Sequence, residues 1–303
     1  MGIGAVARTI EGLERAPARG SVLAGLLGHG IRLSRSPAMH EAEGAAQGLT
    51  YIYRLLDTAE IEADVSVAEM LRAAELCGFS GLNVTYPYKV EVIDHLDELS
   101  PAARAVGAVN TVVFADGKRR GHNTDLWGFS EAFRGGMPQA KRDRVLQLGA
   151  GGAGAAVAHA LAESGVGQLL IVDKDMAKAE ALAARIIAAH GAGRAEAVPG
   201  LEAPVAGDVD GLVNTTPVGM ASVPGTPVPP EFVTPHLWVA DIVYFPLETE
   251  LLRIARAKGC QVLPGSSMAV FQAVRAFQHF TGLAPDEGRM EAAFNAFDED
   301  GPG

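Results

Sequence analysis

The sequence predicts an α/β fold with two domains and mainly parallel strands. Short apolar runs alternate with segments of helical periodicity along the chain, which is the pattern of strands joined by helices. A second series of these units begins at residue 144, and 303 residues are more than one hydrophobic core usually holds. We therefore expect two domains in one chain.

The first half of the chain is expected to form three strands, three helices and a hairpin. Ser36-Pro37 is typical of a helix start, because serine caps the first turn and proline fits inside it. Asp116-Gly117 is typical of the tight turn of a hairpin. The predicted strands are 21–28, 51–56 and 81–85, the helices are 36–47, 67–76 and 87–99, and the hairpin is 108–123.

The second half repeats the alternation of strand and helix. The expected strands are 144–149, 168–173, 211–214 and 238–244, and the expected helices are 153–164, one that ends near residue 189, and 250–258. The segments 191–204 and 222–235 are biased toward Pro, Gly and Ala and are expected to be loops. Residues 298–303 are expected to form a frayed tail.

Composition and charge argue against several classes of protein. Hydrophobic residues make up 48% and charged residues 20% of the chain, as in an ordinary globular protein. The net charge of −11 argues against nucleic acid or an anionic membrane as the main partner. Residues 1–20 lack the apolar segment of a secretory signal. Cys77 and Cys260 are far apart, which fits a reducing compartment, so we expect a cytoplasmic protein.

A glycine cluster at the start of the second series predicts a nucleotide site. The run is Gly149-Ala150-Gly151-Gly152-Ala153-Gly154. It follows an apolar strand, opens a helix and precedes a strand that ends at Asp173, which is the context of a dinucleotide-binding Rossmann unit. Glycines let backbone N–H groups approach a pyrophosphate, and the start of a helix is partly positive. The alternative is a glycine-rich turn in an α/β domain without a ligand.

Asp173 bears on which nicotinamide cofactor binds. A carboxylate at this position accepts hydrogen bonds from the ribose hydroxyls and repels a 2′-phosphate. Lys174 and Lys178 are close in sequence and soften that repulsion. The alternative interpretation is that Asp173 only caps the next helix. We predict that NAD is preferred over NADP, with Lys178 among the residues near the cofactor.

Three polar motifs lie next to predicted strand ends or helix starts, where a polar side chain that becomes buried is expected to have a functional role. Ser34 and Ser36 place two hydroxyls near a helix start, an arrangement suited to a carboxylate. Lys89 follows a strand end, where α/β sheets bind their ligands, and Asp125 follows the hairpin. A lysine paired with an aspartate can manage a proton at an alcohol carbon while hydride leaves to a nicotinamide. The simpler interpretations are helix caps for Ser36 and Asp125, and a solvated helix residue for Lys89.

Five motifs follow one another in an order that is specific. They are Ser34-Arg-Ser-Pro-Ala-Met-His40, Asn83-Val-Thr-Tyr-Pro-Tyr-Lys89, Gly107-Ala-Val-Asn-Thr111, Gly121-His-Asn-Thr-Asp125 and Asn214-Thr-Thr-Pro-Val-Gly-Met220. In this order and wording the chain resembles the shikimate dehydrogenase family, including its NAD-using quinate/shikimate branch. The resemblance extends over residues 22–285, nearly the whole chain.

The resemblance implies a fold and an activity. The implied fold is a Rossmann NAD(P)-binding domain at 125–264 and an α/β substrate-binding catalytic domain at 1–124, completed by 265–303, with the active site in the cleft between them. The implied reaction is the NAD(P)-dependent interconversion of shikimate and 3-dehydroshikimate. Oxidation of quinate to 3-dehydroquinate is implied as a second reaction.

The resemblance also implies roles for individual residues. Lys89 and Asp125 match the catalytic pair, and Ser34 and Ser36 match the residues that hold the substrate carboxylate. The residues that match ring-hydroxyl contacts are Thr85, Asn110 and Gln272, and Tyr244 matches an active-site tyrosine. The residues that match the dinucleotide site are Gly149, Ala150, Gly151, Gly152, Ala153, Gly154, Asp173, Thr216, Met220, Ile242 and Gly265.

Three departures from the family pattern bear on specificity. Leu33 stands where the family usually has a histidine before the first serine, and Gly28-His29-Gly30 lacks the proline common in that loop. Asp173-Lys174-Asp175 stands where NADP-dependent members usually carry Asn-Arg-Thr/Ser, as in the NAD-using branch. The sequence leaves the ring substrate open between shikimate and quinate.

Other functions are weighed beside this one. The alternatives are a dehydrogenase of another cyclitol acid, such as quinate alone or an amino analogue of shikimate, and a nucleotide-sensing regulator without turnover. Intact Lys89 and Asp125 argue against the regulator. The histidines form no HExxH or similar pair, so no metal site is expected. The expected partner is a small cyclitol carboxylate, neither nucleic acid nor a membrane, and the sequence leaves a homodimer open.

Overall fold

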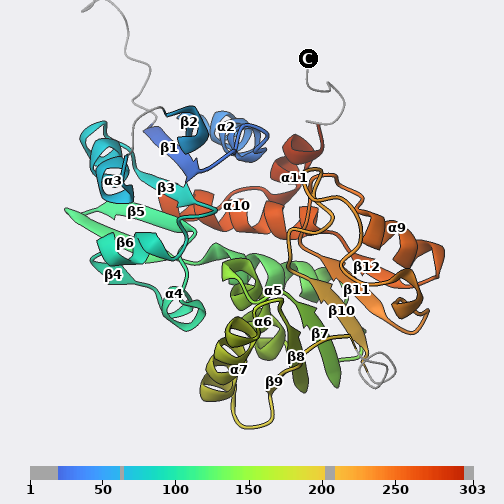
Figure 1. Ribbon diagram of the computed structural model, residues 1–303. Helices are drawn as coiled ribbons and strands as arrows, with labels where there is room; N and C mark the ends of the chain where they lie inside the picture. The colour runs from blue at the N-terminus through green and yellow to red at the C-terminus, as the bar shows by residue number, and fades with distance from the viewer. Residues whose placement is uncertain (1–19, 62–64, 202–208, 297–303) are drawn as a thin grey trace, which may run out of the picture.

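Two six-stranded sheets, each with helices on its faces, form the two halves of the molecule (Figure 1). The computed structural model describes residues 20–61, 65–201 and 209–296. The segment 1–20, for which no secretory signal is predicted, lies outside these ranges except for Gly20, and the predicted frayed tail at 298–303 lies outside them entirely. Within them, no helix is both long and apolar enough to cross a membrane.

The first sheet mixes parallel and antiparallel strands. Its members are β1 (Ser21–Gly28), β2 (Thr50–Asp57), β3 (Gly81–Val84), β4 (Glu98–Leu99), β5 (Thr111–Ala115) and β6 (Lys118–His122), in the order β2-β1-β3-β5-β6-β4. β1 pairs in parallel with β2 and β3, whereas β5 is antiparallel to both of its neighbours. The predicted hairpin is confirmed: it turns at Asp116 and Gly117, with φ values of 55° and 70°, the left-handed values that such a turn requires.

Helices cover both faces of the first sheet. They are α2 (Ser36–Ala46), α3 (Val67–Leu76), α10 (Gly265–Thr281) and α11 (Glu287–Ala296). Successive residues of a strand point to opposite faces. Leu26 of β1 is therefore buried with residues of α2, α10 and α11, and Leu27 is buried with residues of α3. The core of this half thus joins the first strands to the last helices of the chain.

The second sheet is entirely parallel. Its strands are β7 (Arg144–Leu148), β8 (Gln168–Val172), β9 (Ala195–Ala197), β10 (Gly211–Asn214), β11 (Trp238–Asp241) and β12 (Gln261–Leu263), in the order β12-β11-β10-β7-β8-β9. The order reverses between β10 and β8, on either side of β7, and ligands of such sheets bind at this reversal, beyond the carboxyl ends of the strands. The glycine cluster follows β7 at that point.

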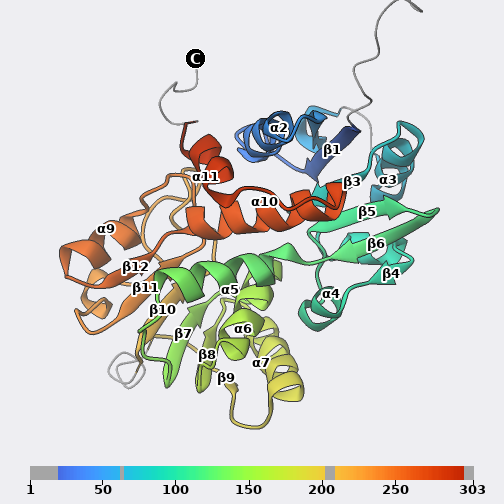
Figure 2. The same cartoon turned by 180° about the vertical axis from the view of Figure 1, so that it is seen from behind.

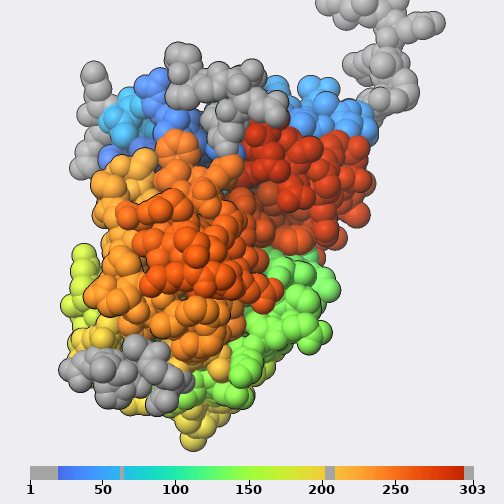
Figure 3. Space-filling model, turned by 90° about the vertical axis from the view of Figure 1, so that its right-hand side faces the viewer, coloured from blue at the N-terminus to red at the C-terminus, as the bar shows by residue number. Residues whose placement is uncertain are grey.

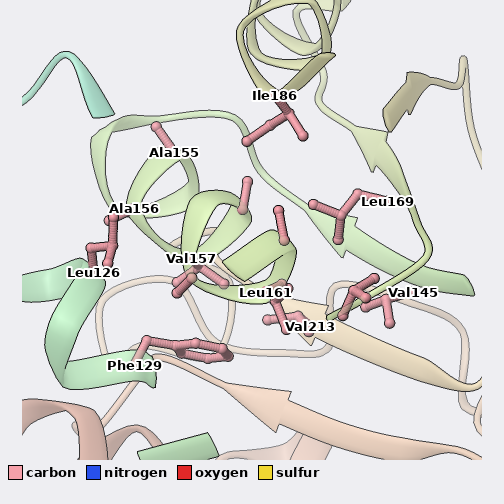
Figure 4. Close-up of a cluster of buried hydrophobic side chains, with 14 of the residues drawn as sticks. Leu126, Phe129, Val145, Ala155, Ala156, Val157, Leu161, Leu169, Ile186 and Val213 are labelled. Carbon is pink, nitrogen blue, oxygen red and sulfur yellow. The ribbon is translucent and has the colours of Figure 1, made fainter. Parts of the chain in front are cut away.

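Helices also cover both faces of the second sheet. They are α5 (Thr124–Gly136), α6 (Gly152–Glu163), α7 (Met176–His190) and α9 (Glu250–Ala257). Figure 4 shows Val157 and Leu161 of α6 pointing toward Phe129 of α5 and Val145 of β7. α6 is buried on almost every side, which explains why residues 145–162 are so apolar.

Helices α5 and α10 connect the two halves. They lie side by side between the sheets in opposite views (Figures 1 and 2). Their backbones touch at Gly128, where an added Cβ would lie 2.9 Å from the backbone nitrogen of Gln272. Figure 3 shows the red C-terminal helices against both the blue N-terminal elements and the green segment. The position of one half relative to the other therefore depends on this helix pair.

The prediction of a helix at 87–99 is wrong. The segment holds only a 3-10 helix, η2 (Glu91–His95), and the strand β4, and the next α-helix is α4 (Pro101–Val106), which Ser100 caps. Backbone groups of this segment make hydrogen bonds with residues distant in sequence instead of with one another, as a helix would require. Lys89 O accepts from Val109 N at 2.7 Å, and Asp97 N donates to Arg119 O at 2.9 Å. Pairing across the sheet thus overrides local helix propensity.

Besides β4, two short strands were missed. β9 lies in a segment that we expected to be a loop, and β12 follows a predicted helix without a signal of its own. Each has three residues, too few for a period of two to be read from the sequence. Both are held at the edges of the sheet by a neighbouring strand, β8 for β9 and β11 for β12.

Candidate active site

Lys89 and Asp125 form a close ion pair between the two sheets. Lys89 Nζ lies 2.6 Å from Asp125 Oδ2, and their side chains are 19% and 3% exposed. Lys89 lies in the loop after β3, and Asp125 lies in the first turn of α5. The N-cap of α5 is Asn123, whose side chain accepts from Leu126 N at 3.0 Å. The simpler interpretations, a solvated helix residue and a helix cap, are therefore both wrong.

The hairpin and Asn110 fix the position of this pair. Val109 N donates to Lys89 O at 2.7 Å, and Asn110 N donates to His122 O at 3.1 Å, so the loop that carries Lys89 and the segment that leads into α5 are tied to the same hairpin. The Asn110 side chain accepts from Thr124 N at 2.7 Å and donates to Thr124 Oγ1 at 3.0 Å. The sequence assigned Asn110 to a ring hydroxyl, which stays a prediction. The structure adds that its amide holds the helix that carries Asp125.

Ser34 and Ser36 lie at the start of α2. The N-cap position of that helix belongs to Arg35, and no side chain caps it, so the interpretation of Ser36 as a cap is wrong. Ser36 N donates to Ser34 Oγ at 3.3 Å. Two hydroxyls are thus held together on one short turn.

A buried arginine stands between the two serines. Arg35 is only 2% exposed, its guanidinium lies 4.6 Å from the centre of the Phe294 ring, and it donates to Phe294 O at 2.8 Å. It thereby attaches α11 to the start of α2. Sequence reasoning did not select Arg35, because a lone arginine gives no sign that it is buried.

Tyr244 is close enough to Asp125 and to Arg35 for the charges of both residues to act on its hydroxyl. Burial raises the pKa of its hydroxyl, the charge of Asp125 raises this pKa further, and the charge of Arg35 lowers it. Its ring lies 6.0 Å from that of Phe294. Tyr244 follows β11 of the second sheet, so it brings a hydroxyl from that half toward the residues of the first.

The two other predicted ring contacts, Thr85 and Gln272, each lie against a glycine. Thr85 follows β3, and its methyl group packs so closely on Gly28 that a Cβ there would lie 2.4 Å away. Gln272 lies on α10 where that helix meets Gly128 of α5. Gly28 is the last residue of β1 and the first of the stretch that lacks the family proline, and its contact with Thr85 allows no side chain.

The glycine cluster has two functions that the geometry separates. Gly149 has a φ of +99°, and a Cβ at Gly154 would lie 2.5 Å from Gly149 O, so these two glycines are required for the tight turn into α6. No atom lies within 4 Å of a Cβ built on Gly151, and a Cβ on Gly152 would lie 3.7 Å from Ala108 Cβ and 4.0 Å from Lys89. The start of α6 therefore has open space beside it and faces the Lys89 loop.

Asp173 is linked directly to the glycine cluster. Its Oδ2 accepts from Ala150 N at 2.7 Å, and its Oδ1 accepts from Asp175 N at 2.9 Å. The N-cap of α7 is Asp175, so the interpretation of Asp173 as that cap is wrong. Lys178 Nζ lies 3.7 Å from Asp175 Oδ2, in an exposed pair. The carboxylate of Asp173 thus stands at the carboxyl end of β8 with the glycine loop attached to it.

A second polar cluster lies at the ends of β10 and β11. Asn214 accepts from Thr216 N at 3.0 Å and donates to Asp241 Oδ1 at 2.9 Å, and Thr249 donates to Asp241 Oδ2 at 2.7 Å. Burial raises the pKa of Asp241 to about 6, although these donors and Val243 N oppose the change. The sequence motif contains Asn214, but reasoning from residues missed Asp241, whose signal is a carboxylate at the end of an apolar strand.

The remaining predicted cofactor residues surround this cluster. Met220 is 40% exposed and forms a β-bridge with Val223. A Cβ on Gly265 would lie 2.5 Å from Ile242 O, so the start of α10 is pressed against the segment after β11. Among the described residues, no three His, Cys, Asp or Glu side chains are grouped so that they could hold a metal ion.

Two curated proteins are similar to this chain over nearly its whole length. A shikimate dehydrogenase (NADP(+)) of Streptomyces avermitilis is 54% identical over 274 residues, which are 90% of this chain and 94% of the relative. A quinate/shikimate dehydrogenase (NAD(+)) of Corynebacterium efficiens is 51% identical over 280 residues, which are 90% of this chain and 98% of the relative. This chain belongs to the shikimate dehydrogenase family.

Family models match both halves of this shikimate dehydrogenase family member. The model described as the shikimate dehydrogenase substrate binding domain matches residues 26–112, which run from β1 into β5. A model described as the ThiF family matches residues 123–196, which run from the cap of α5 to β9 and include the glycine cluster. The predicted α/β fold with a Rossmann half and a substrate-binding half is confirmed.

Solved structures of this family share the arrangement of both halves. A quinate dehydrogenase from Corynebacterium glutamicum in complex with NAD has a TM-score of 0.86 and 48% identity, covering 91% of this chain and 99% of the other. A shikimate 5-dehydrogenase from Thermus thermophilus in complex with NADP(H) and shikimate has a TM-score of 0.79 and 37% identity, with the same coverage of 91% and 99%.

Proposed function

We propose that this chain is an NAD(P)-dependent dehydrogenase that interconverts shikimate and 3-dehydroshikimate, prefers NAD, and also oxidises quinate to 3-dehydroquinate. The observation that carries the proposal is the 2.6 Å pair of Lys89 and Asp125 beside the start of α6. The pair lies where a ring held by the first half would meet a nicotinamide held by the second. The names of the similar proteins support both ring substrates and both cofactors.

The pair is suited to moving a proton at the reacting hydroxyl. Bound NAD would accept the hydride from the carbinol carbon. Lys89 and Asp125 would take up the hydroxyl proton as the carbonyl forms and return it in the reverse reaction. Their burial supports this role, because an electrostatic interaction is stronger where water is excluded.

The substrate is proposed to lie across the first half with its carboxylate at α2. Ser34 and Ser36 would donate to the carboxylate, with the buried charge of Arg35 nearby. The hydroxyls of the ring would be paired by Thr85, Asn110, Gln272 and Tyr244. In this arrangement 1–124 and 265–303 form the substrate-binding domain and 125–264 the dinucleotide-binding domain, with the ion pair at the boundary.

The cofactor is proposed to bind along the carboxyl edge of the second sheet. The open space at Gly151 and Gly152 fits a pyrophosphate, since a side chain there would fill it. Asp173 would accept from the adenosine ribose, with Lys178 on the nearby helix. The nicotinamide end would lie against Thr216, Met220, Ile242 and Gly265, beyond Ala150, Ala153 and the other members of the glycine cluster.

One set of initial rates tests the proposal. Shikimate and quinate are each assayed with NAD and with NADP, and NADH or NADPH formation is followed by absorbance. We expect turnover of shikimate with NAD, slower turnover with NADP, and measurable oxidation of quinate. Absence of turnover for both acids with either cofactor would contradict the proposal, and turnover of quinate alone would favour the quinate-only alternative.

Location and assembly follow as further predictions. We propose a cytoplasmic enzyme that binds neither nucleic acid nor a membrane surface, in keeping with a net charge of −11 and with Cys77 and Cys260 both free. A homodimer stays a prediction. Light scattering coupled to gel filtration measures the mass, for which the monomer value is 31.5 kDa.

A further inference from the structure

A buried carboxylate binds the loop that leads from β1 to the two serines. Asp57 is the last residue of β2, is only 6% exposed, and lies beside Gly28, the last residue of β1, in the parallel sheet. Its Oδ1 accepts from Gly30 N at 2.7 Å, and its Oδ2 accepts from Ile31 N at 2.8 Å. The side chain thus holds two successive backbone N–H groups of the loop between β1 and α2.

The same carboxylate caps a short helix of its own strand. Asp57 Oδ1 also accepts from Ala59 N at 3.0 Å, which makes Asp57 the N-cap of the 3-10 helix η1 (Thr58–Glu60). Burial by itself would raise the pKa of Asp57, but the three backbone donors outweigh it and lower this pKa below its usual value. The side chain is therefore ionised at neutral pH and acts only as an acceptor. The simplest interpretation of Asp57 is that it only caps η1.

The hydrogen bonds continue from the loop to the first serine. Ser34 N donates to Ile31 O at 2.9 Å, which closes a four-residue turn from Ile31 to Ser34. Ser36 N in turn donates to Ser34 Oγ at 3.3 Å. Asp57 therefore holds the first residue of the turn, and Ser34 is the last residue of the same turn.

The loop has the conformation that this contact requires. Gly30 has a φ of +68°, a left-handed value that glycine adopts readily and that proline cannot adopt. No atom lies within 4 Å of a Cβ built on Gly30, so the backbone conformation rather than a lack of space favours glycine here. A proline at this position would also lack the N–H group that donates to Asp57. The absence of the family proline from this stretch is thus compatible with the contact to Asp57.

The start of the loop is held independently of Asp57. His29 N donates to Tyr86 O at 3.0 Å, in the segment that carries Lys89. That segment is itself bonded to the residues before the hairpin through Lys89 O. Loss of the Asp57 carboxylate should therefore loosen residues 30–34 and leave the segment of Lys89 in place.

We propose that Asp57 is a positioning residue for the carboxylate of the substrate, acting through the turn that ends at Ser34. The proposal rests on the function proposed above, in which Ser34 binds that carboxylate. Binding costs less when a donor is held in place before the ligand arrives. Asp57 therefore affects the binding of the acid rather than the proton transfer at Lys89.

Two substitutions separate the contact with the loop from the cap of η1. Asp57→Asn replaces one carboxylate oxygen by an NH₂ group, so in either orientation of the amide a donor faces a backbone N–H group. Asp57→Ser keeps a good N-cap residue, but it offers one oxygen instead of two on a side chain one bond shorter. We expect Asp57→Ser to retain the cap and to release Gly30 and Ile31.

Glu75 provides a matched control in the same half of the molecule. It is a partly buried carboxylate on α3, 23% exposed, and it accepts from Arg119 Nε at 2.9 Å and from Arg119 Nη2 at 2.7 Å. Arg119 belongs to β6, which β3 and β5 separate from β1. Glu75→Gln thus also removes a bound carboxylate, but at a place distant from the serines in the sheet.

The experiment is a double-mutant cycle on the full-length enzyme with NAD. KM for shikimate, kcat, KM for NAD and urea unfolding are measured for Asp57→Asn, Asp57→Ser, Ser34→Ala, the double variant Asp57→Asn/Ser34→Ala and Glu75→Gln. We expect both Asp57 variants to raise KM for shikimate about five- to tenfold, with kcat and KM for NAD within about twofold. In the Ser34→Ala background, Asp57→Asn should change KM by less than about twofold. Glu75→Gln should lower the free energy of unfolding and leave all three kinetic constants within about twofold.

Each contrary result has a separate meaning. An unchanged KM in Asp57→Ser overturns the proposal, because Asp57 would then only cap η1. A fall of KM in Asp57→Asn also overturns it, since repulsion between Asp57 and the acid would then outweigh any hold on the loop. An equal rise in Glu75→Gln, or in both backgrounds of the cycle, would show that general loss of stability suffices, and the proposal fails. If Ser34→Ala itself leaves KM unchanged, the carboxylate site of the proposed function fails, and this proposal fails with it.

A further variant covers the case in which the Asp57 variants do not fold. Gly30→Ala keeps the N–H group and adds a methyl group in open space at an exposed position, but it strains the left-handed backbone of the loop. We expect KM for shikimate to rise about two- to fourfold and this rise to disappear in the Ser34→Ala background. A folded Gly30→Ala with unchanged KM overturns the proposal in that case.

Discussion

The two halves of the molecule build their parts of the site by opposite means. The first uses polar side chains that hold one another: Asn110 fixes Thr124, and Asn83 fixes Tyr53. The second uses the backbone at positions where side chains are excluded, as at Gly154, where a Cβ would lie 2.5 Å from Gly149 O. The part of the site in the first half should therefore lose its function when a polar group is removed. The part in the second half should lose its function when a side-chain atom is added.

The chemistry of the two ligands explains this difference. A ring acid is recognised by hydroxyls and a carboxylate at fixed positions, and a buried polar group left without its partner discriminates strongly. A pyrophosphate is recognised by backbone N–H groups and the partial charge of a helix start, which require close approach rather than a particular side chain. Four predictions test the contrast, beginning with the largest expected effect.

Loss of Lys89 should reduce turnover the most. Lys89→Ala is expected to lower kcat by roughly 10²- to 10⁴-fold, the usual range for a positioned acid or base, with little change in cofactor binding. Asp125→Ala acts on the same step, so the double variant should be less than additive. Lys118→Ala, which removes an exposed lysine paired with Glu98, is the control and should keep wild-type kcat. Wild-type turnover of Lys89→Ala, measured under saturating shikimate and NAD, would contradict the proposed mechanism.

Addition of one methyl group should break the second half. Gly154→Ala is expected to weaken NAD binding about tenfold or more and to destabilise the fold by roughly 1–3 kcal/mol, because the new Cβ overlaps Gly149 O. Gly135→Ala is the control, since no atom lies within 4 Å of a Cβ there. Calorimetric titration with NAD and urea unfolding measure the two effects. Equal NAD affinity in Gly154→Ala and the wild type would contradict the close-approach argument.

Replacement of Asp173 should change both the preference for NAD over NADP and the conformation of the glycine loop, because the same carboxylate bears on both. Asp173→Ser is expected to lower the ratio of kcat/KM for NAD to that for NADP by about tenfold, because it removes the repulsion of a 2′-phosphate. It should also raise KM for NAD, since Ala150 N loses the acceptor 2.7 Å away. Asp175→Ser, which removes the exposed partner of Lys178, should change the ratio little. A wild-type preference for NADP would refute the argument.

Asp241 should have the smallest effect on turnover and a clear effect on stability. Burial raises its pKa from 3.8 to about 6 in the folded protein. Between pH 3.8 and about pH 6, folding is therefore accompanied by the uptake of a proton at this carboxyl. The favourable contribution of the neutral carboxyl is present below about pH 4 and is lost as the pH rises through 6, a change of roughly 2–3 kcal/mol. Asp241→Asn cannot ionise, so its free energy of unfolding should fall less over this interval. Urea unfolding at pH 4 and pH 7 measures the difference, and equal changes in both proteins would contradict the burial argument.

The sequence predicted the parts of this fold that depend on local pattern. Strands such as β7 and β10 were found because they are short apolar runs, buried on both faces, and the helix α3 was found because its apolar residues recur with helical spacing. The helix predicted at 87–99 failed because Lys89 O and Asp97 N are bound by residues far along the chain. No local pattern carries information about such partners.

The candidate site was predictable in membership but not in geometry. The motifs named Lys89 and Asp125, whereas the 2.6 Å between them comes from the hairpin and the cap of α5. Arg35 and Asp241 were missed because each is recognisable only by its burial, which depends on packing between elements distant in sequence. These residues can be recognised only in the folded protein, where their burial is visible.

The packing of α10 and α11 has a consequence for how the protein is made. Ala24, on the first strand, belongs to the same buried cluster as Phe277 and Phe294, which lie near the end of the described residues. During synthesis the first sheet therefore leaves the ribosome with one apolar face uncovered. This face becomes covered only after α10 and α11 have been made. The strands of the second sheet, β7 to β12, lie between 144 and 263 and can pair before then. We expect the part of the chain that is made first to be the last to complete its fold.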